Sequence, residues 1–225
     1  VVSASACGYN PFNFLITSAM ENMIPTNTKP RCSWVTSDPI YLDYHDDEWG
    51  QPIRDDRQLF EFLTLEGAQA GLNWLTVLKR RENYRLAFDQ FDVQKIAKYD
   101  QDKVNELMNN SGIIRNKLKI LSTITNANAF LNVQAEHGSF STFIWQFVNG
   151  EPMRNNWKNS TEVPSKTPIS DSMSGALKAR GFKFVGSTIC YAFMQAVGMV
   201  NDHTMDCFCY NASHHKQSNT NATIL

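Results

Sequence analysis

Apolar residues in this sequence recur at three- and four-residue steps over many segments, whereas alternation of apolar and polar residues rarely lasts beyond four positions. The first pattern is typical of helices that bury one face, and the second is what a strand would require. We therefore expect an all-α fold. The sequence has no repeat at solenoid spacing. Its 225 residues are enough for one large domain or for two small ones that share a core.

The helices can be placed from their apolar stripes and capping residues. Leu59, Phe60 and Leu63 indicate a helix over 57–70, and Asn73 is a suitable N-cap for a second helix over 74–88. Thr167 is a suitable cap for a helix that has proline in its first turn. Further helices are expected over 93–99, 102–109, 116–136, 141–147, 168–180 and 185–197.

Composition and charge exclude several classes of protein. Hydrophobic residues make up 42% and aromatic residues 12% of the chain, as in a globular protein. The sequence contains no apolar run near the roughly 20 residues that span a bilayer. The net charge is -1, so any binding to nucleic acid must come from local basic patches. Five cysteines, an odd number, argue against a disulfide framework and fit a reducing compartment.

The two ends of the chain differ in composition from the part between them. Residues 1–30 lack the features of a signal peptide, and we expect them to be poorly ordered or to precede the natural start. Residues 211–225 are rich in Asn, Ser, Thr and His, which predicts a flexible tail. The polar stretch 149–165 predicts a loop or a domain junction.

Glu66 is the first candidate for chemistry. It follows Leu59 and Leu63 by seven and three residues, so a helix would aim its carboxylate at the apolar face. One interpretation is a structural salt bridge or a hydrogen bond at the helix end, because an inward carboxylate is costly unless paired. The other is a carboxylate at the floor of a pocket. Small residues follow it as far as Gly71, and Trp74 then opens the next helix. A carboxylate beside an indole suits a flat cationic ligand.

Aromatic residues gather near the beginning of the predicted folded region, at Trp34, Tyr41, Tyr44 and Trp49. Aromatic side chains are more often core residues than ligand contacts, and we expect most of these to pack in the core. Tyr44 is the exception because it adjoins His45, which is itself a candidate metal ligand.

Four residues from the two ends of the predicted folded region form a candidate metal site. Cys32 and His45 lie thirteen residues apart, while His203 and Cys207 lie four apart and can share one face of a helical turn. Two thiolates and two imidazoles suit a closed tetrahedral zinc site. The alternative is that the histidines are capped surface groups and the cysteines are packing residues. Cys209 competes with Cys207 as a ligand.

A basic turn lies between two of the predicted helices. Residues Ser111–Ile114 form the turn, and Arg115, Lys117 and Lys119 follow at once. A turn that leads into a helix N-terminus offers backbone N–H groups to a phosphate, and the basic side chains add charge. An ordinary helical hairpin with a solvated basic face is the alternative.

Taken together, these stretches resemble the 3-methyladenine DNA glycosylase I family of bacteria, which belongs to the helix-hairpin-helix glycosylase superfamily. The resemblance runs from about residue 31 to residue 210, and the order and spacing of its stretches make it specific. The matching stretches are RCSWV (31–35), YHDDEWG (44–50), LEGAQAG (65–71), WLTVLKR (74–80), GIIR (112–115), GFKFVG (181–186) and NDH (201–203).

The resemblance implies roles for the residues of the pocket. Glu66 corresponds to the acid that hydrogen-bonds the damaged base, and Trp74 to the indole that stacks on it. Tyr44 corresponds to a residue that lines the same pocket. Trp34 and Trp49 match aromatic positions around it.

The resemblance also implies a cofactor and a surface for DNA. The four Cys and His residues of the candidate metal site match the ligands of one structural zinc ion that joins the two ends of the predicted folded region. Residues Gly112, Ile113, Ile114 and Arg115, with Lys117 beyond them, match the hairpin that grips the DNA backbone.

A division of the chain and a set of partners follow from the same resemblance. We expect a zinc-containing helical domain from 31–55 and 150–210, and a helix-hairpin-helix domain from 56–149. The expected partner is alkylated double-stranded DNA, with free 3-methyladenine as the product. We expect a monomer in the bacterial cytoplasm without a membrane partner. The implied reaction is hydrolysis of the N-glycosidic bond of 3-methyladenine, and 3-methylguanine is a further candidate substrate.

The sequence departs from the wider superfamily at two points. Ile114 stands where most superfamily members have a second hairpin glycine, which weakens the case for close phosphate approach. The catalytic aspartate of the wider superfamily has no obvious counterpart, as is also true of the glycosylase I family.

Two other functions stay open at this point. A zinc-dependent hydrolase could use Glu66 as general base, although four Cys and His ligands would leave no open coordination position. A zinc-stabilised DNA-binding module without activity is the second alternative.

Overall fold

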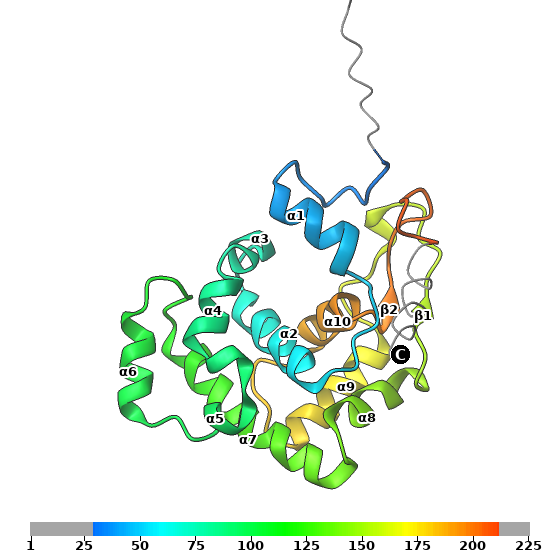
Figure 1. Cartoon of the computed structure of the whole chain (residues 1–225). Coiled ribbons are helices and arrows are strands. Elements are labelled where there is room, and N and C mark those ends of the chain that lie inside the picture. The colour runs from blue at the N-terminus through cyan, green and yellow to red at the C-terminus, as the bar shows by residue number, and fades with distance from the viewer. Residues whose placement is uncertain (1–28, 212–225) are drawn as a thin grey trace, which may run out of the picture.

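Helix α2 (Asp56–Gln69) runs through the middle of the fold (Figure 1). It packs against α10 (Ser187–Ala196) and against α7 (Lys117–His137), the longest helix of residues 29–211. This computed structural model describes residues 29–211, and the predictions for residues 1–28 and 212–225 lie outside the described residues. Helices dominate the described part of the chain, which confirms the all-α prediction.

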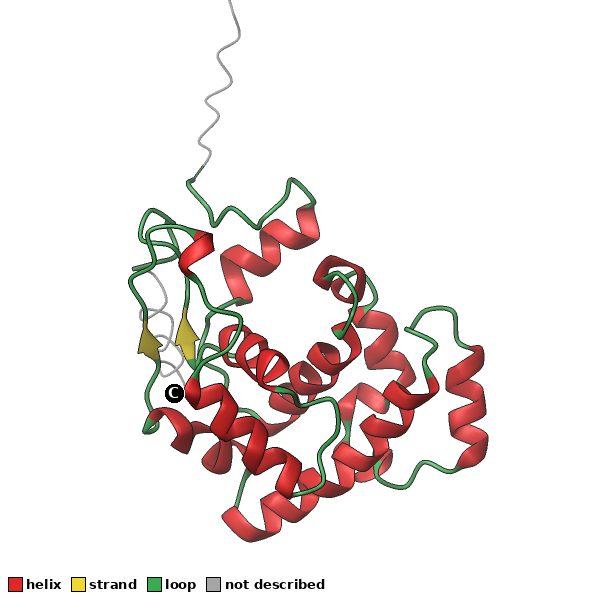
Figure 2. Cartoon of the chain, turned by 180° about the vertical axis from the view of Figure 1, so that it is seen from behind, coloured by secondary structure: helices red, strands yellow, loops and turns green. Residues whose placement is uncertain are grey.

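Shorter helices surround these three (Figures 1 and 2). The others in the described range are α1 (Pro39–Asp43), α3 (Trp74–Leu78), α4 (Arg81–Ala87), α5 (Val93–Ile96), α6 (Gln101–Asn109), α8 (Phe140–Trp145) and α9 (Pro168–Ala179), with single turns η1 (Tyr44–Glu48), η2 (Asp89–Phe91), η3 (Gln146–Val148) and η4 (Ser160–Glu162).

A short parallel pairing is the one departure from all-helical structure within residues 29–211. Strand β1 (Met153–Arg154) pairs with β2 (Val200–Asn201), with Met153 opposite Val200 (Figure 2). The pairing fixes part of the predicted 149–165 loop against the segment that leads to the second half of the candidate metal site.

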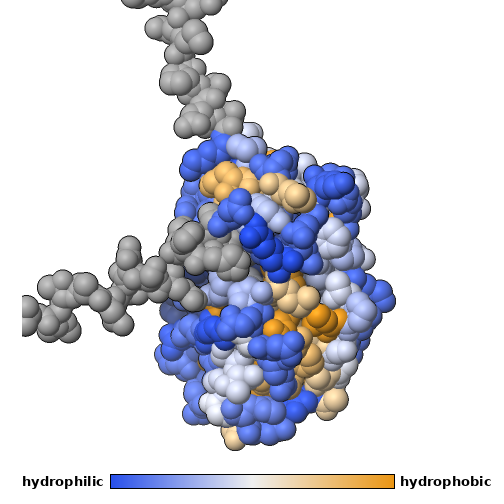
Figure 3. Space-filling model, turned by 90° about the vertical axis from the view of Figure 1, so that its right-hand side faces the viewer, coloured by the Kyte–Doolittle hydropathy of each residue, from blue (hydrophilic) through white to orange (hydrophobic). Residues whose placement is uncertain are grey.

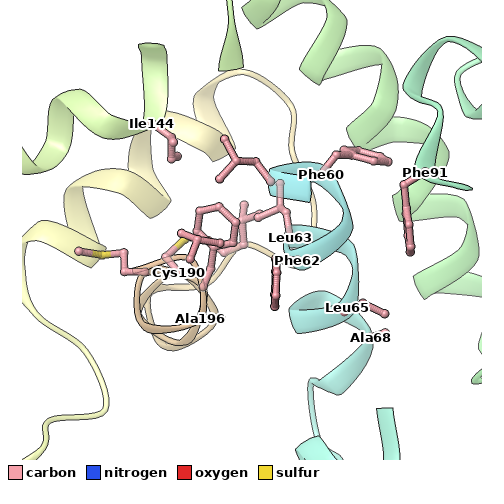
Figure 4. Close-up of a cluster of buried hydrophobic side chains, with 14 of the residues drawn as sticks. Phe60, Phe62, Leu63, Leu65, Ala68, Phe91, Ile144, Cys190 and Ala196 are labelled. Carbon is pink, nitrogen blue, oxygen red and sulfur yellow. The ribbon is translucent and has the colours of Figure 1, made fainter. Parts of the chain in front are cut away.

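Most side chains along the central helix are buried. Asp55 caps the helix by accepting a hydrogen bond from the backbone N–H of Gln58 at 2.9 Å. Figure 4 shows Phe60 pointing toward Phe91 on one side of α2 and Leu63 toward α10 on the other. A helix that is buried on nearly all sides holds its side chains in fixed positions, because every rotamer is set by neighbours.

The predicted single helix over 74–88 is wrong. It is divided into α3 and α4, because Arg80 leaves the helical conformation with φ of -104° and ψ of 1°. Arg81 then turns its guanidinium toward Glu48, at 2.5 Å, and toward Glu61. These ion pairs lie between distant segments, so the local apolar pattern did not indicate them.

The sequence prediction also omitted α1. Its signal was present, since Asp38 accepts a hydrogen bond from the N–H of Ile40 and Pro39 occupies the first turn. Asp38 also pairs with Lys79, just beyond α3, at 2.5 Å. Helix α1 and the η1 turn thereby form a wall beside the end of α2.

One face of the molecule is mostly hydrophilic, with apolar side chains gathered in a patch (Figure 3). None of the helices formed by residues 29–211 combines the length and the apolar character that crossing a bilayer requires.

Gly198 lies where two distant segments cross. Its φ is +68°, and a Cβ atom added there would lie 2.3 Å from the carbonyl carbon of Gln51. Beside this crossing, the N–H of Ile53 donates to the carbonyl of Val197 at 3.1 Å. Only glycine allows the backbone of the N-terminal segment to approach the end of α10 this closely.

We expect Gly198→Ala to lower the free energy of unfolding by about 2–5 kcal/mol, because the new methyl group overlaps backbone atoms at a left-handed residue. Gly175→Ala is the matched control. It lies within α9 with open space around its Cβ position, and it should stabilise the protein by about 0.5–1 kcal/mol. Chemical denaturation measures both. Equal stability of the two variants would contradict this account of the crossing.

Candidate functional site

A cavity of about 380 Å³ opens at the end of α2. It is bounded by four parts of the chain: residues 32–49, the end of α2 with the start of α3, residues 160–165, and α10 with the segment after it. Its lining residues are Cys32, Trp34, Tyr41, Tyr44, Trp49, Glu66, Gln69, Trp74, Ser160, Val163, Pro164, Ser165, Thr188, Tyr191, Ala192, Gln195, Asp202 and Thr204.

Glu66 lies in the wall of this cavity. The residue is 3% exposed, and no hydrogen bond or ion pair from residues 29–211 reaches its carboxyl group. Burial raises its pKa to about 8, because the charged form loses its hydration. The structural salt bridge considered from the sequence is therefore absent among the described residues. A buried acid without a protein partner remains available to a ligand.

Trp74 and Tyr44 stand close together in the same wall, with their ring centroids 5.5 Å apart. Trp74 begins α3, whose N-cap is Asn73, so the short connection from α2 brings the indole near Glu66. Its buried N–H has no partner in the described part of the chain. Burial, and then the charge of Glu66, raise the pKa of Tyr44 well above its usual value.

Trp34 and Trp49 form the side of the cavity nearest the candidate metal site. Their rings meet edge to face at 4.9 Å, and Trp34 also meets Tyr41 at 5.1 Å. Trp49 is 9% exposed, so it is mainly a packing residue that borders the cavity. The structure thus brings all five predicted pocket residues to one cavity.

Sequence reasoning missed a group of polar residues that also line the cavity. Asp202 is buried, and its carboxylate accepts hydrogen bonds from Tyr191 Oη at 2.7 Å and Gln195 Nε2 at 2.8 Å. It also accepts from Asn155 Nδ2 and Trp157 Nε1, each at 2.7 Å. Four donors satisfy this carboxylate, in contrast to that of Glu66. The available signal was its position next to His203.

The four predicted metal ligands meet in one buried cluster. Their ligand atoms all lie within 4.8 Å of one another, although the residues come from both ends of the described chain. Cys207 Sγ lies 3.4 Å from His45 Nε2 and 3.6 Å from His203 Nδ1, and Cys32 Sγ lies 3.6 Å from His203 Nδ1. This Cys and His group could hold a metal ion.

The remaining ring nitrogens of the two histidines face oxygen atoms. His45 Nδ1 lies 2.8 Å from a carboxylate oxygen of Asp46, and His203 Nε2 lies 3.2 Å from the carbonyl oxygen of Trp49. Each oxygen favours the N–H on the nitrogen that faces it, so the other nitrogen presents its lone pair to the cluster. The donor set therefore fits a metal ion.

Cys209 was the competing ligand, and its position distinguishes it from Cys207. Its thiol points to the backbone carbonyls of His45 and Asp46, at 3.9 and 3.8 Å. It belongs to a second group with His45 and Asp46 that lacks the other ligands. Hydrogen bonds from Cys209 and Cys32 lower the pKa of Cys207, which favours its thiolate form.

Residues 110–116 join α6 to α7 and contain the basic turn. Ile113 is buried. The N–H of Gly112 donates to Asn110 Oδ1 at 2.8 Å, and the N–H of Ile114 donates to Tyr84 Oη at 3.1 Å. These two N–H groups therefore hold the turn in shape instead of facing outward.

The three basic residues after the turn have different surroundings. Arg115 and Lys117 are exposed at the start of α7. Lys119 was expected to add charge for a phosphate, but it points inward. Its ammonium donates to the carbonyls of Ala68 and Ala70, both at 2.7 Å.

Comparison with known proteins places this arrangement in a family. The family model for methyladenine glycosylase matches residues 34–210. DNA-3-methyladenine glycosylase 1 of Escherichia coli K12 is 52% identical over 180 residues, which cover 80% of this chain and 96% of the relative.

Solved structures agree with the sequence comparison. A crystal structure of 3-methyladenine DNA glycosylase I, 52% identical, superposes with a TM-score of 0.79 and covers 80% of this chain and 100% of that one. A tyrosine-to-phenylalanine variant of such an enzyme, in complex with 3-methyladenine, is 36% identical with a TM-score of 0.77, covering 79% of this chain and 95% of that one. The chain therefore belongs to the methyladenine glycosylase family.

Proposed function

We propose that this protein is a monofunctional DNA glycosylase that hydrolyses the N-glycosidic bond of 3-methyladenine in alkylated double-stranded DNA, with 3-methylguanine as a further substrate. It would begin base excision repair as a monomer in the bacterial cytoplasm. The proposal rests on the buried, unpartnered carboxyl group of Glu66, which lines one cavity with the indole of Trp74. Family membership supplies the reaction class.

The cavity suits an extruded base. Its volume of about 380 Å³ lies within the range of small-molecule sites, about 300–1,000 Å³. A base inside a duplex is out of reach of such a site, so the nucleotide must rotate out of the stack. Extrusion is easiest at a damaged pair, which already favours the methylated nucleotide.

The chemistry of the wall suits a cation. Methylation at N3 gives the adenine a positive charge, and the faces of Trp74 and Tyr44 attract positive charge. With a pKa of about 8, Glu66 is mostly protonated near neutral pH in the empty cavity. A cationic base lowers that pKa, so the ionised carboxylate pairs with the charge and accepts a hydrogen bond from the adenine edge. Stacking on the indole contributes about 1–3 kcal/mol.

Direct attack by water completes the proposed reaction. The cationic base is a good leaving group, so the N-glycosidic bond breaks with the electron pair going to the base. Water adds to the sugar carbon and loses a proton to solvent. No lysine is among the described residues that line the cavity, which supports hydrolysis over a Schiff-base route. Trp34 and Trp49 would then enclose the base from the side of the metal cluster.

We propose that Cys32, His45, His203 and Cys207 bind one structural zinc ion. Two thiolates and two imidazoles make a closed set, and the ring nitrogens away from the cluster already face oxygen atoms. The ion would supply folding stability and would join the beginning of the described chain to its end.

The hairpin formed by α6, the basic turn and α7 is proposed to bind the DNA backbone in the manner of a helix-hairpin-helix motif. The exposed Arg115 and Lys117 would pair with phosphates. Gly112, Ile113 and Ile114 would give the turn its shape. Residues 56–149 would then form the helix-hairpin-helix domain, and 31–55 with 150–210 the zinc-containing domain. Both parts line the cavity.

We expect Glu66→Gln to lower single-turnover release of 3-methyladenine from methylated duplex DNA by about 100-fold or more, because it removes the ionisable group that faces the cationic base. Glu151→Gln, at an exposed position outside the hairpin and the cavity lining, should keep full activity. Chromatography of the released base measures both. If the unaltered protein binds the duplex but releases no base, it is a binding module and the proposed function is wrong.

The stability of the protein should depend on pH through the ionisation of Glu66. The folded-state pKa of about 8 exceeds the ordinary value of 4.5, so its contribution is complete below about pH 4.5 and is lost as the pH rises through about 8. Glutamine stays neutral. The Tm of Glu66→Gln minus that of the unaltered protein should therefore grow from about pH 5 to about pH 9. A constant difference would show that the buried carboxyl group titrates normally.

Metal analysis tests the cluster. The purified protein should contain about one zinc ion per chain, and Cys207→Ala should lose it together with thermal stability. Cys209→Ala and Cys190→Ala should keep the metal, because neither thiol belongs to the four-residue set. Zinc retained in Cys207→Ala but lost in Cys209→Ala would instead identify Cys209 as the ligand.

A further inference from the structure

We propose that Lys119 is a positioning residue that couples the DNA-binding hairpin to the cavity. This inference rests on the proposed function. Lys119 lies in the first turn of α7, directly after the basic turn, and its ammonium binds the last carbonyls of α2. One side chain therefore connects the element proposed to hold the phosphates with the helix end that carries Glu66.

The two hydrogen bonds of Lys119 lie at the end of α2, where the connection to Trp74 begins. Ala68 lies two residues after Glu66, and Ala70 is the C-cap of the helix. Helix α2 has no basic residue in its own last turn. The ammonium thus supplies the positive charge that the carbonyl end of a helix favours, and it fixes the direction of both carbonyls.

The last turn of α2 is held between the cavity and the hairpin. Glu66 faces the cavity, while the neighbouring Ala68 shares a tight buried space with Ile114 and Lys119. On the same side, a Cβ atom at Gly67 would lie 3.3 Å from Phe184 Cβ. A displacement of the hairpin would therefore be transmitted to the turn that carries Glu66, because close packing leaves little room for independent movement.

Lys119 and Lys117 have the same chemistry but different partners. Lys117 is exposed, whereas Lys119 is partly buried and held by two carbonyls. A phosphate-binding lysine and a positioning lysine should therefore affect different steps. Loss of Lys117 should weaken binding to DNA, and loss of Lys119 should slow the reaction of DNA that is already bound.

The test compares Lys119→Met, Lys119→Arg and Lys117→Met in single-turnover release of 3-methyladenine from methylated duplex at saturating protein. We expect Lys119→Met to lower the rate constant by about 10- to 100-fold, the effect of a small misplacement of the reacting groups. Lys119→Arg should recover most of it, because guanidinium also donates to two carbonyls. Lys117→Met should keep the rate constant but need more protein for saturation, increasingly so at higher salt.

Amide hydrogen exchange provides a readout that does not need catalysis. Undamaged duplex should increase the protection of residues 67–74 in the unaltered protein and in Lys117→Met at saturation, but not in Lys119→Met. Lys98→Met, at an exposed lysine outside the hairpin, should behave as the unaltered protein does in both assays.

Three results would overturn the coupling role. They are an unchanged rate constant in Lys119→Met, equal losses in Lys119→Met and Lys119→Arg, and equal DNA-induced protection of residues 67–74 in Lys119→Met and the unaltered protein. If the unaltered protein released no base, the proposed function would be wrong, but the exchange comparison would still decide whether Lys119 transmits DNA binding to the cavity.

Discussion

The buried carboxyl group of Glu66 is the constraint around which the cavity is built. A carboxylate removed from water is unfavourable unless charge or hydrogen bonds compensate it, and none is supplied by residues 29–211. Asp202, which also lines the cavity, shows the contrast, because four side chains satisfy it. The fold therefore tolerates an unfavourable buried carboxyl group at Glu66. Such groups are common in binding sites, where a bound ligand supplies the missing charge or hydrogen bonds.

Rigid surroundings keep that group in place. Helix α2 is buried on nearly all sides, and Lys119 binds its last carbonyls. The Cys and His cluster holds residues 32–45 against the segment after α10, so Tyr44 and Trp49 line one cavity with the end of α2. A cavity assembled from four distant parts of the chain depends on these connections, since no single element contains it.

The sequence was informative where a property is local. The bounds of α2 and α7, and the capping of α9 by Thr167, follow from apolar spacing and short-range hydrogen bonds. The break after α3 was missed because Arg81 pairs with acids far away in the sequence. The choice between Cys207 and Cys209, and the inward direction of Lys119, likewise depend on which segments become neighbours after folding. Motif resemblance brought together the residues of the cavity, but it did not reveal its polar wall.

The internal hydrogen bonds of the basic turn have a consequence for recognition. Because the N–H groups of Gly112 and Ile114 are already bound to Asn110 and Tyr84, the turn loses its conformational freedom when the protein folds. If the turn binds DNA as proposed, little further ordering is needed when a duplex binds, because the surface is already preorganised. The strength of that binding would be set by the exposed charges alone, while the shape of the surface stays the same for any base sequence.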